Sequence, residues 1–218
     1  MVEIVPAILT NDVADFRLKY SQLLALGHHF SKIHIDFIDG EFLSEKTIMP
    51  SDLKFLATPF HLMAHFMTLH PENYFEDAKA IGFEWIIVHF EAFKTIDALL
   101  DCLDKAKNMK LKIGVCINPE TPLHKIAKAL PLVDLVQIMG VHPGAQGRVF
   151  EPNTFEKIKE LKSLRGNVII SVDGGIKLGI AGKCVRAGAY MIIIGSGILH
   201  ATHPKEALEA FKRELELI

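Results

Sequence analysis

Four polar residues in three short hydrophobic segments have the types and the order of a divalent-metal site: His34, Asp36, His65 and Asp173. His34 and Asp36 stand two residues apart in an apolar run, so an extended strand would turn both side chains to one face as a two-point chelate. Two of the four are carboxylates, which can take up and return protons. If the four side chains converge, the sequence predicts a metal-assisted enzyme that moves a proton.

Each of these residues also has an ordinary structural interpretation. A buried histidine taken alone is more often a hydrogen-bonded core residue than a ligand, and Asp173 is compatible with capping a following helix. Asp36 needs a stronger reason, because burying an unpaired carboxylate in an apolar strand is costly unless a cation compensates it. The four residues together therefore favour a metal site. His89 also ends an apolar run, but it has no evident partner, and we interpret it as structural or as a neighbour of the site.

The elements that would position these residues alternate along the chain. Eight short hydrophobic runs of β type occur at 4–9, 32–37, 60–65, 85–89, 111–117, 135–139, 168–172 and 191–194. Amphipathic stretches of helical type separate them at 12–26, 71–81, 96–109, 122–130, 153–164, 178–187 and 204–217, and the connection near 51–57 is short. Start signals such as Asn11-Asp12 and His70-Pro71 precede two of the helical stretches. Strict alternation of this kind predicts parallel strands joined by right-handed crossovers.

Eight such units of roughly 27 residues fit a closed (β/α)8 TIM barrel near its lower size limit. Polar residues at the carboxyl ends of the strands agree with this fold, because that end of the barrel holds the active site. An open, doubly wound sheet is the alternative. It is less well supported, because no Gly-x-Gly-x-x-Gly motif follows the first run.

Composition places the chain among compact globular proteins. Its 218 residues are 50% hydrophobic with a formal net charge of -2, which predicts one domain over residues 1–218 and a small-molecule partner rather than nucleic acid. The first residues resemble a strand rather than a signal peptide, and no apolar run approaches the ~20 residues of a membrane span. Cys102, Cys116 and Cys184 are odd in number and widely spaced, so we expect no disulfide framework, no thiolate zinc site and a cytoplasmic location.

Three glycine-bearing turns in the last third of the chain indicate a phosphate site. They are Val141-His-Pro-Gly-Ala-Gln-Gly147, Asp173-Gly-Gly175 and Gly195-Ser-Gly197, and each follows one of the last three β runs. Glycine lets backbone amides approach an anion closely, and TIM barrels often bind phosphate after strands seven and eight, beside a short extra helix. Residues 195–200 could form that helix. One glycine turn is weak evidence, but three in these positions favour a phosphorylated substrate.

Six motifs, in this order and spacing, resemble the ribulose-phosphate 3-epimerase family over nearly the whole chain. They are Pro6-Ala-Ile-Leu-Thr10, Ile33-His-Ile-Asp-Phe-Ile-Asp-Gly40, Asn118-Pro-Glu-Thr-Pro122, Val136-Gln-Ile-Met-Gly-Val-His-Pro-Gly144, Ser171-Val-Asp-Gly-Gly175 and Gly195-Ser196. The resemblance implies a (β/α)8 barrel of the ribulose-phosphate-binding type that holds one divalent metal ion per chain, usually zinc, iron(II), manganese or cobalt. It also implies a homo-oligomer, either a dimer or a hexamer.

Carried over by position, the resemblance implies roles for individual residues. His34, Asp36, His65 and Asp173 would coordinate the metal, and Asp36 and Asp173 would also act as the catalytic acid and base on opposite faces of the substrate. The implied substrate contacts are Thr10, His65, Met67, Met139, Gly144, Gly147, Gly174, Gly175, Gly195 and Ser196. The methionines among them would line the site near the reacting carbon, and the glycines and the serine would surround the phosphate.

The chain departs from the family pattern mainly in the phosphate loop. His142-Pro-Gly-Ala-Gln-Gly-Arg148 stands where the family has Asn-Pro-Gly-Phe-Gly-Gly-Gln, so Gln146 replaces a glycine and Arg148 replaces a glutamine. Arg148 would either strengthen anion binding or face solvent. The changes at Ala145, Gln146 and Arg148 leave open whether the sugar has five carbons or six.

The predicted activity is that of a metal-dependent sugar-phosphate 3-epimerase, an isomerase that interconverts D-ribulose 5-phosphate and D-xylulose 5-phosphate in the pentose phosphate pathway. Two-base proton transfer at C3 would pass through a metal-stabilised enediolate. The alternatives are an allulose-6-phosphate 3-epimerase and a non-catalytic phosphosugar-binding paralogue. A decarboxylase of the orotidine-phosphate type is disfavoured, because its Asp-x-Lys-x-x-Asp motif has no counterpart in Asp36-Phe-Ile-Asp39.

Overall fold

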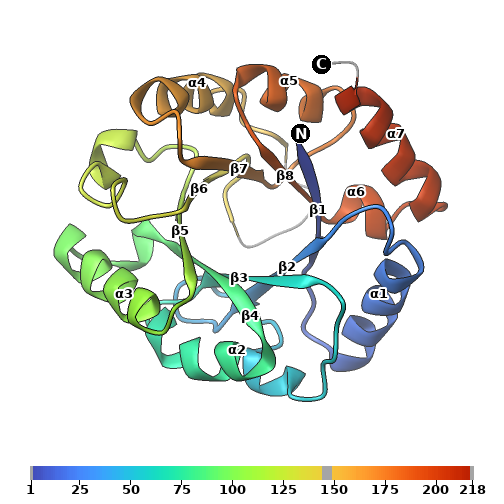
Figure 1. The fold of residues 1–218 in the computed structure, drawn as a ribbon, viewed down its shortest axis with the longest axis horizontal. Helices are drawn as coiled ribbons and strands as arrows, with labels where there is room; N and C mark the ends of the chain where they lie inside the picture. The colour runs from blue at the N-terminus through green and yellow to red at the C-terminus, as the bar shows by residue number, and fades with distance from the viewer. Residues whose placement is uncertain (1, 144–148, 217–218) are drawn as a thin grey trace.

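A closed barrel of eight parallel strands forms the centre of the protein (Figure 1). The computed structural model describes residues 2–143 and 149–216. The strands follow chain order around the barrel: β1 Glu3–Ile8, β2 Lys32–Ile38, β3 His61–Met67, β4 Phe83–His89, β5 Lys112–Ile117, β6 Leu135–Met139, β7 Ile169–Asp173 and β8 Met191–Ile194. Because β1 pairs with β8, the predicted (β/α)8 barrel is confirmed and the open doubly wound sheet is wrong.

Helices surround this barrel on the outside (Figure 1). The α-helices are α1 Val13–Ala25, α2 Phe75–Ile81, α3 Ile96–Asn108, α4 Thr154–Leu164, α5 Ile180–Ala187, α6 Ser196–Leu199 and α7 Pro204–Glu216. Four short 3-10 helices join them: η1 Pro50–Leu53, η2 Pro71–Tyr74, η3 Phe90–Ala92 and η4 Leu123–Ile126. Asp12 caps α1 by accepting a hydrogen bond from the backbone N–H of Asp15, as the start signal in the sequence predicted. The short extra helix expected near 195–200 is α6.

The helix predicted over 122–130 is wrong, since the structure forms only η4 there. Leu123, Ile126 and Ala129 are buried at intervals of three residues. A repeat of three fits the 3-10 turn, whereas an α-helix presents one face every 3.6 residues. The predicted helix over 71–81 likewise divides into η2 and α2.

Alternation along the strands separates two cores. On β2, Ile33, Ile35 and Phe37 face the core between the barrel and the helices, while His34 and Asp36 face the barrel interior. A second cluster of buried apolar side chains fills that interior, with these members: Val5, Ala7, Met63, Trp85, Ile87, Cys116, Leu135, Met139, Met191 and Ile193. Five of its members lie in the amino halves of their strands, namely Val5, Met63, Trp85, Leu135 and Met191. The polar side chains therefore rest on a packed apolar base.

The turns after β6 and β7 fit together closely. The backbone N–H of Gly140 donates a hydrogen bond to the carbonyl of Asp173 at 2.6 Å. A Cβ atom at position 140 would lie 2.5 Å from the carbonyl oxygen of Gly174, so a larger residue would push the two turns apart. Gly174 and Gly175 both have positive φ angles, 93° and 69°, which favour glycine. This junction fixes the backbone that carries the Asp173 side chain.

Candidate metal centre and active site

Strand register brings the four predicted metal ligands together at the carboxyl ends of β2, β3 and β7. Asp36 and His65 are direct Cα partners in the β2–β3 pairing, and His34 lies two residues before Asp36 on the same inward face. Asp173 ends β7, where it pairs with Met139 of β6. Because strands β1 and β8 complete the ring between β2 and β7, closure of the barrel is required for Asp173 to meet Asp36.

The ligand atoms of these four buried side chains all lie within 4.8 Å of one another. His65 Nδ1 is 2.8 Å from Asp36 Oδ1 and 3.5 Å from Asp173 Oδ2. His34 Nε2 is 3.1 Å from Asp36 Oδ1 and 3.6 Å from Asp173 Oδ2. Two imidazole nitrogens and two carboxylate oxygens are a donor set that suits a divalent ion such as zinc, iron(II) or manganese. The residues therefore fit the metal that the sequence predicted.

Burial and charge give the two carboxyl groups opposite protonation tendencies. For Asp36, burial would raise the pKa, but His34 and His65 outweigh it and hold the pKa well below its usual range. For Asp173, burial together with the neighbouring Asp36 carboxylate raises the pKa to about 7, against an opposing effect of His34. One ionised and one protonated carboxyl side by side is the arrangement that acid–base catalysis uses.

The two histidines of the cluster also differ. Burial lowers the pKa of His65 to about 3. The neighbouring His89 and His34 also lower this pKa, whereas Asp36 raises it. His65 is therefore neutral and has a free ring lone pair. Burial likewise would lower the pKa of His34, but Asp36 and Asp173 outweigh it and raise the pKa. A divalent cation among these groups would favour neutral imidazoles and ionised carboxylates.

One cavity contains both the carboxylates and most of the described phosphate candidates. Its walls are Ala7, Leu9, Asp36, Ile38, Met67, Met139, Val141, Pro143, Asp173, Gly174, Gly175, Ile176, Ile193, Gly195 and Ser196. The two glycine turns and the two methionines singled out in the sequence therefore lie beside the carboxylates. Thr10 is not among the residues that line this cavity, and its hydroxyl donates to the Asp15 carboxylate.

The remaining part of the predicted phosphate loop falls outside the described residues. This applies to Gly144, Ala145, Gln146, Gly147 and Arg148. Their predicted contacts with phosphate stay predictions.

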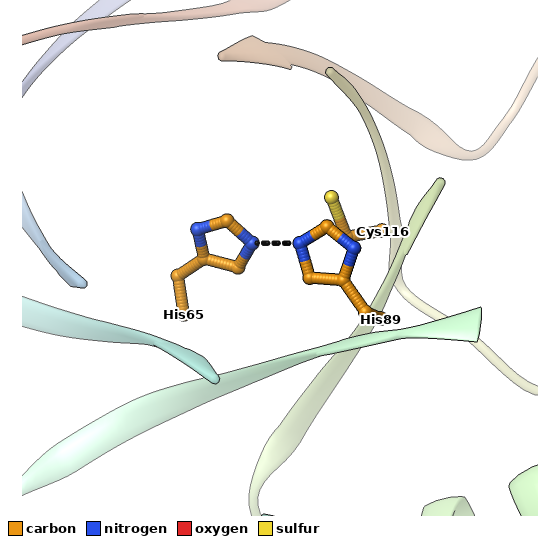
Figure 2. Close-up of side chains that lie close together, drawn as sticks. All are labelled: His65, His89 and Cys116. Atoms are coloured by element: carbon orange, nitrogen blue, oxygen red, sulfur yellow. Dashed lines mark hydrogen bonds between the residues drawn. The ribbon is translucent and has the colours of Figure 1, made fainter. Parts of the chain in front are cut away.

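The structure gives His89 a partner and agrees with its interpretation as a neighbour of the site. Figure 2 shows the His89 ring pointing at the His65 ring from the neighbouring strand, with the two Nε2 atoms 2.9 Å apart. His89 Nδ1 contacts the Glu91 carboxylate at 3.2 Å. The signal was present in the sequence, because Trp85, Ile87 and His89 alternate on the inward face of one strand.

Sequence reasoning also missed two interior side chains, Gln137 and Cys116. Gln137 Nε2 donates to Asp173 Oδ2 at 3.3 Å and lies 3.8 Å from Cys116 Sγ. Cys116, His65 and His89 form a second group whose ligand atoms lie within 4.8 Å of one another (Figure 2). A single glutamine or cysteine in an apolar strand carries no spacing signal, so only the fold reveals these contacts.

Other expectations have clear outcomes in the described residues. Asp39 makes a turn, since its Oδ1 accepts from the backbone N–H groups of Glu41 and Phe42. Asp173 does not cap α5, which starts at Ile180 after Gly179. The three cysteines are free and buried. Between residues 2 and 143 and between 149 and 216, no helix is long and apolar enough to cross a membrane.

Residues 3–199 match the model of the ribulose-phosphate 3 epimerase family. The chain belongs to this family. It is 33% identical to a ribulose-phosphate 3-epimerase from Synechocystis over 95% of this chain and 91% of that protein. It is 29% identical to the cytoplasmic isoform of ribulose-phosphate 3-epimerase from Oryza sativa over 98% of this chain and 94% of that protein.

Membership of the ribulose-phosphate 3-epimerase family makes the protein an isomerase that acts on carbohydrates. Among solved structures, 3-hexulose-6-phosphate synthase from Salmonella typhimurium has a similar fold. Its TM-score is 0.74 at 14% identity, and the match covers 99% of each chain. At that identity the likeness concerns the barrel alone, and the chemistry must be argued from this epimerase's own side chains.

Proposed function

We propose that this epimerase interconverts D-ribulose 5-phosphate and D-xylulose 5-phosphate by two-base proton transfer at C3. The observation that carries the proposal is the pair Asp36 and Asp173, whose carboxylates belong to one buried cluster and share one cavity with the glycine turns. An ionised carboxylate removes the C3 proton, and a protonated carboxyl returns one to the other face. For the reverse reaction the two groups exchange roles.

The surrounding side chains prepare these carboxyls for proton transfer. Gln137 donates to Asp173 Oδ2, and the Gly140 N–H holds the Asp173 carbonyl, so both the side chain and its backbone are oriented. Met67 and Met139 add an apolar, polarizable wall that excludes water from the reacting carbon. A proton on Asp173 would thereby transfer to the substrate rather than to water.

His34, Asp36, His65 and Asp173 are proposed to hold one divalent metal ion. The fit rests on their donor set and on the spacing of their ligand atoms within 4.8 Å. When bound, such an ion would supply positive charge to stabilise the oxyanion that develops as the C3 proton leaves. The ligands' own part is to keep two neutral imidazoles and two carboxylates directed at one point.

The phosphate of the substrate is proposed to lie against Gly174, Gly175, Gly195 and Ser196. These residues line the same cavity as the two carboxylates, and glycine allows backbone N–H groups to approach an anion closely. This position would leave the sugar carbons between the phosphate and Asp36. Thr10 stays a predicted substrate contact.

The decisive experiment is solvent-deuterium incorporation at C3 by purified protein of known metal content. Ribulose 5-phosphate and allulose 6-phosphate are offered separately. Exchange with formation of xylulose 5-phosphate supports the proposal, and a preference for allulose 6-phosphate assigns the six-carbon activity instead. Absence of exchange with both sugars, in protein that carries one metal ion per chain, contradicts epimerisation of these substrates and favours a binding paralogue.

Two further parts of the proposal concern assembly and location. A homo-oligomer, dimer or hexamer, and a cytoplasmic location both stay predictions, the latter supported by the name of the Oryza sativa relative. Sedimentation of the purified protein would decide between the dimer and the hexamer.

A further inference from the structure

A row of buried polar groups leads away from the proposed metal site through three strands. Asp36 Oδ1 faces His65 Nδ1 at 2.8 Å, His65 Nε2 faces His89 Nε2 at 2.9 Å, and His89 Nδ1 faces the Glu91 carboxylate at 3.2 Å. His65 and His89 are fully buried. Figure 2 shows the middle contact, which joins the Nε2 atoms of the two rings.

The three contacts need more hydrogens than the two rings supply. A neutral imidazole carries one N–H and one lone pair, and an ionised carboxylate only accepts. Two neutral histidines between two carboxylates therefore provide two N–H groups for three contacts. In this neutral form, one contact is left with two acceptors facing each other, and a metal cation or an added proton on one ring would compensate it.

The far end of the row decides which contact lacks a hydrogen. Glu91 Oε1 accepts from the Thr121 hydroxyl at 2.5 Å and from the Asn118 N–H at 2.8 Å, which keeps Glu91 an ionised acceptor. Its Oε2 atom then accepts from His89 Nδ1–H. His89 then has no hydrogen on Nε2, and this nitrogen accepts a hydrogen bond from His65 Nε2–H. His65 carries its one hydrogen on Nε2, so its Nδ1 has none.

We propose that Glu91 and His89 are positioning residues that hold His65 as its Nε2–H tautomer, so that the Nδ1 lone pair is presented to the metal ion beside Asp36. The inference rests on the proposed metal site and extends it to two residues that do not touch the ion. Hydrogen-bonded partners of this kind orient a histidine ligand and increase its affinity for the metal. Thr121 and Asn118, from the segment after β5, anchor the row.

The competing arrangement places a second metal ion among His65, His89 and Cys116. It would require both Nε2 atoms as ligands, and their 2.9 Å contact would have to open. It would also remove the hydrogen that the proposed row places between the rings. The two arrangements therefore predict different metal contents, one ion per chain against two.

The first test is the protonation of His65 Nε2, measured by nitrogen-15 NMR of the histidine side chains in metal-free and Zn²⁺-loaded protein. The proposal expects a protonated Nε2 in both forms and a metal-bound Nδ1 in the loaded form. An unprotonated Nε2 in either form overturns it. Because the metal-free protein is measured as well, this test stands even if the proposed metal site were wrong.

The second test is Glu91→Gln, which should reverse the direction of the hydrogen bonds along the row. The glutamine carbonyl would keep accepting from Thr121 and Asn118, so its NH₂ group would face His89 Nδ1. His89 would then carry its hydrogen on Nε2, and His65 would carry its hydrogen on Nδ1. We expect that tautomer by NMR, together with Zn²⁺ affinity about 10- to 100-fold weaker by chelator competition.

The matched control is Glu84→Gln on strand β4, the strand that carries His89, which breaks an exposed contact between Glu84 and His61. It should keep the tautomer and the Zn²⁺ affinity of the parent protein. Unchanged Zn²⁺ affinity in Glu91→Gln, or two Zn²⁺ ions per chain in the parent protein, would overturn the inference. If Glu91→Gln does not fold, the NMR result on the parent protein still decides it. Failure of the parent to bind Zn²⁺ would count against the metal site and not against the tautomer.

Discussion

At the scale of single residues, Asp36 and Asp173 show how surroundings separate two identical side chains. Both carboxyls are buried, but Asp36 contacts the rings of His34 and His65 more closely than Asp173 does. Asp36 therefore takes the negative charge, and burial together with that charge raises the pKa of Asp173. The two groups titrate as a pair, so a change at one alters the other.

Asp173→Asn tests the two-base assignment. The amide has nearly the shape of the carboxyl but cannot transfer the proton, so inversion at C3 should fall by about 10²- to 10⁴-fold. Asp36 would still exchange the C3 proton of one epimer with solvent. The measurement is deuterium incorporation and epimer formation from each pentose phosphate, with Asp77→Asn on the surface as the control. Inversion within about tenfold of the parent rate would refute the role of Asp173.

Glu91 should also make stability depend on pH. Burial would raise its pKa, but His89, Thr121 and the Asn118 N–H outweigh burial and lower the pKa from its ordinary value of 4.5. The unfolded chain then takes up the proton first as pH falls, so this stabilisation is present above pH 4.5 and is lost below it, through the lower pKa of the folded state.

This dependence is measured as a difference between two proteins. Chemical unfolding of metal-free parent protein and of Glu91→Gln is compared from about pH 6 to about pH 3, and the parent's advantage should shrink toward the acid end. Other carboxyls contribute equally to both proteins and cancel. A difference that is constant over this range would show that the charge of Glu91 does not stabilise the fold.

At the scale of elements, helix α4 holds the segment after β5 in place through one lysine. Lys157 Nζ donates to the carbonyls of Asn118 at 3.0 Å, Pro119 at 2.6 Å and Thr121 at 2.5 Å. Burial lowers the pKa of Lys157, against the effect of nearby glutamates. The lysine thereby fixes the residues that anchor Glu91, which links an outer helix to the proposed row of hydrogen bonds.

Lys157→Met should destabilise the protein by about 2–4 kcal/mol, because buried carbonyls lose their charged donor. Zn²⁺ affinity should also weaken, since the anchor of Glu91 loosens. The measurements are urea unfolding and chelator competition. Lys159→Met is the matched control on the same helix, where an exposed pair with Glu156 is worth about 0–1 kcal/mol. Equal effects of the two substitutions would contradict the proposed role of Lys157.

At the scale of the whole molecule, the proposed metal ligands come from strands that only a closed barrel brings together. His34 and Asp36 lie on β2, His65 on β3 and Asp173 on β7. An ion bound to all four would favour the folded state over the unfolded chain, in which these residues are far apart. Metal binding and folding should therefore be coupled.

Zn²⁺ at about 100 times its Kd should raise the Tm by about 5–10 °C, which corresponds to about 2.7 kcal/mol for a chain of this length. A chelator should reverse the rise. His34→Gln should abolish it, whereas His61→Gln, at an exposed position, should keep it. A Zn²⁺-induced rise of the same size in His34→Gln would place the stabilising ion elsewhere in the protein.

The sequence alone determined the alternation of strands with helices and pointed to the four polar side chains of the proposed site, because both are written in the order of residues along the chain. Period-2 alternation turned His34 and Asp36 to one face, and strict alternation of strands with helices required a barrel or a wound sheet. Only the tertiary structure decided barrel closure, the contact of His65 with His89 and the reach of Lys157 to Pro119. These contacts join residues 24 and 38 positions apart, and their geometry depends on strand register and on packing between elements. The conformation of η4 was likewise decided by tertiary packing. Its buried residues pack into the core as a 3-10 turn, although the local sequence favours an α-helix.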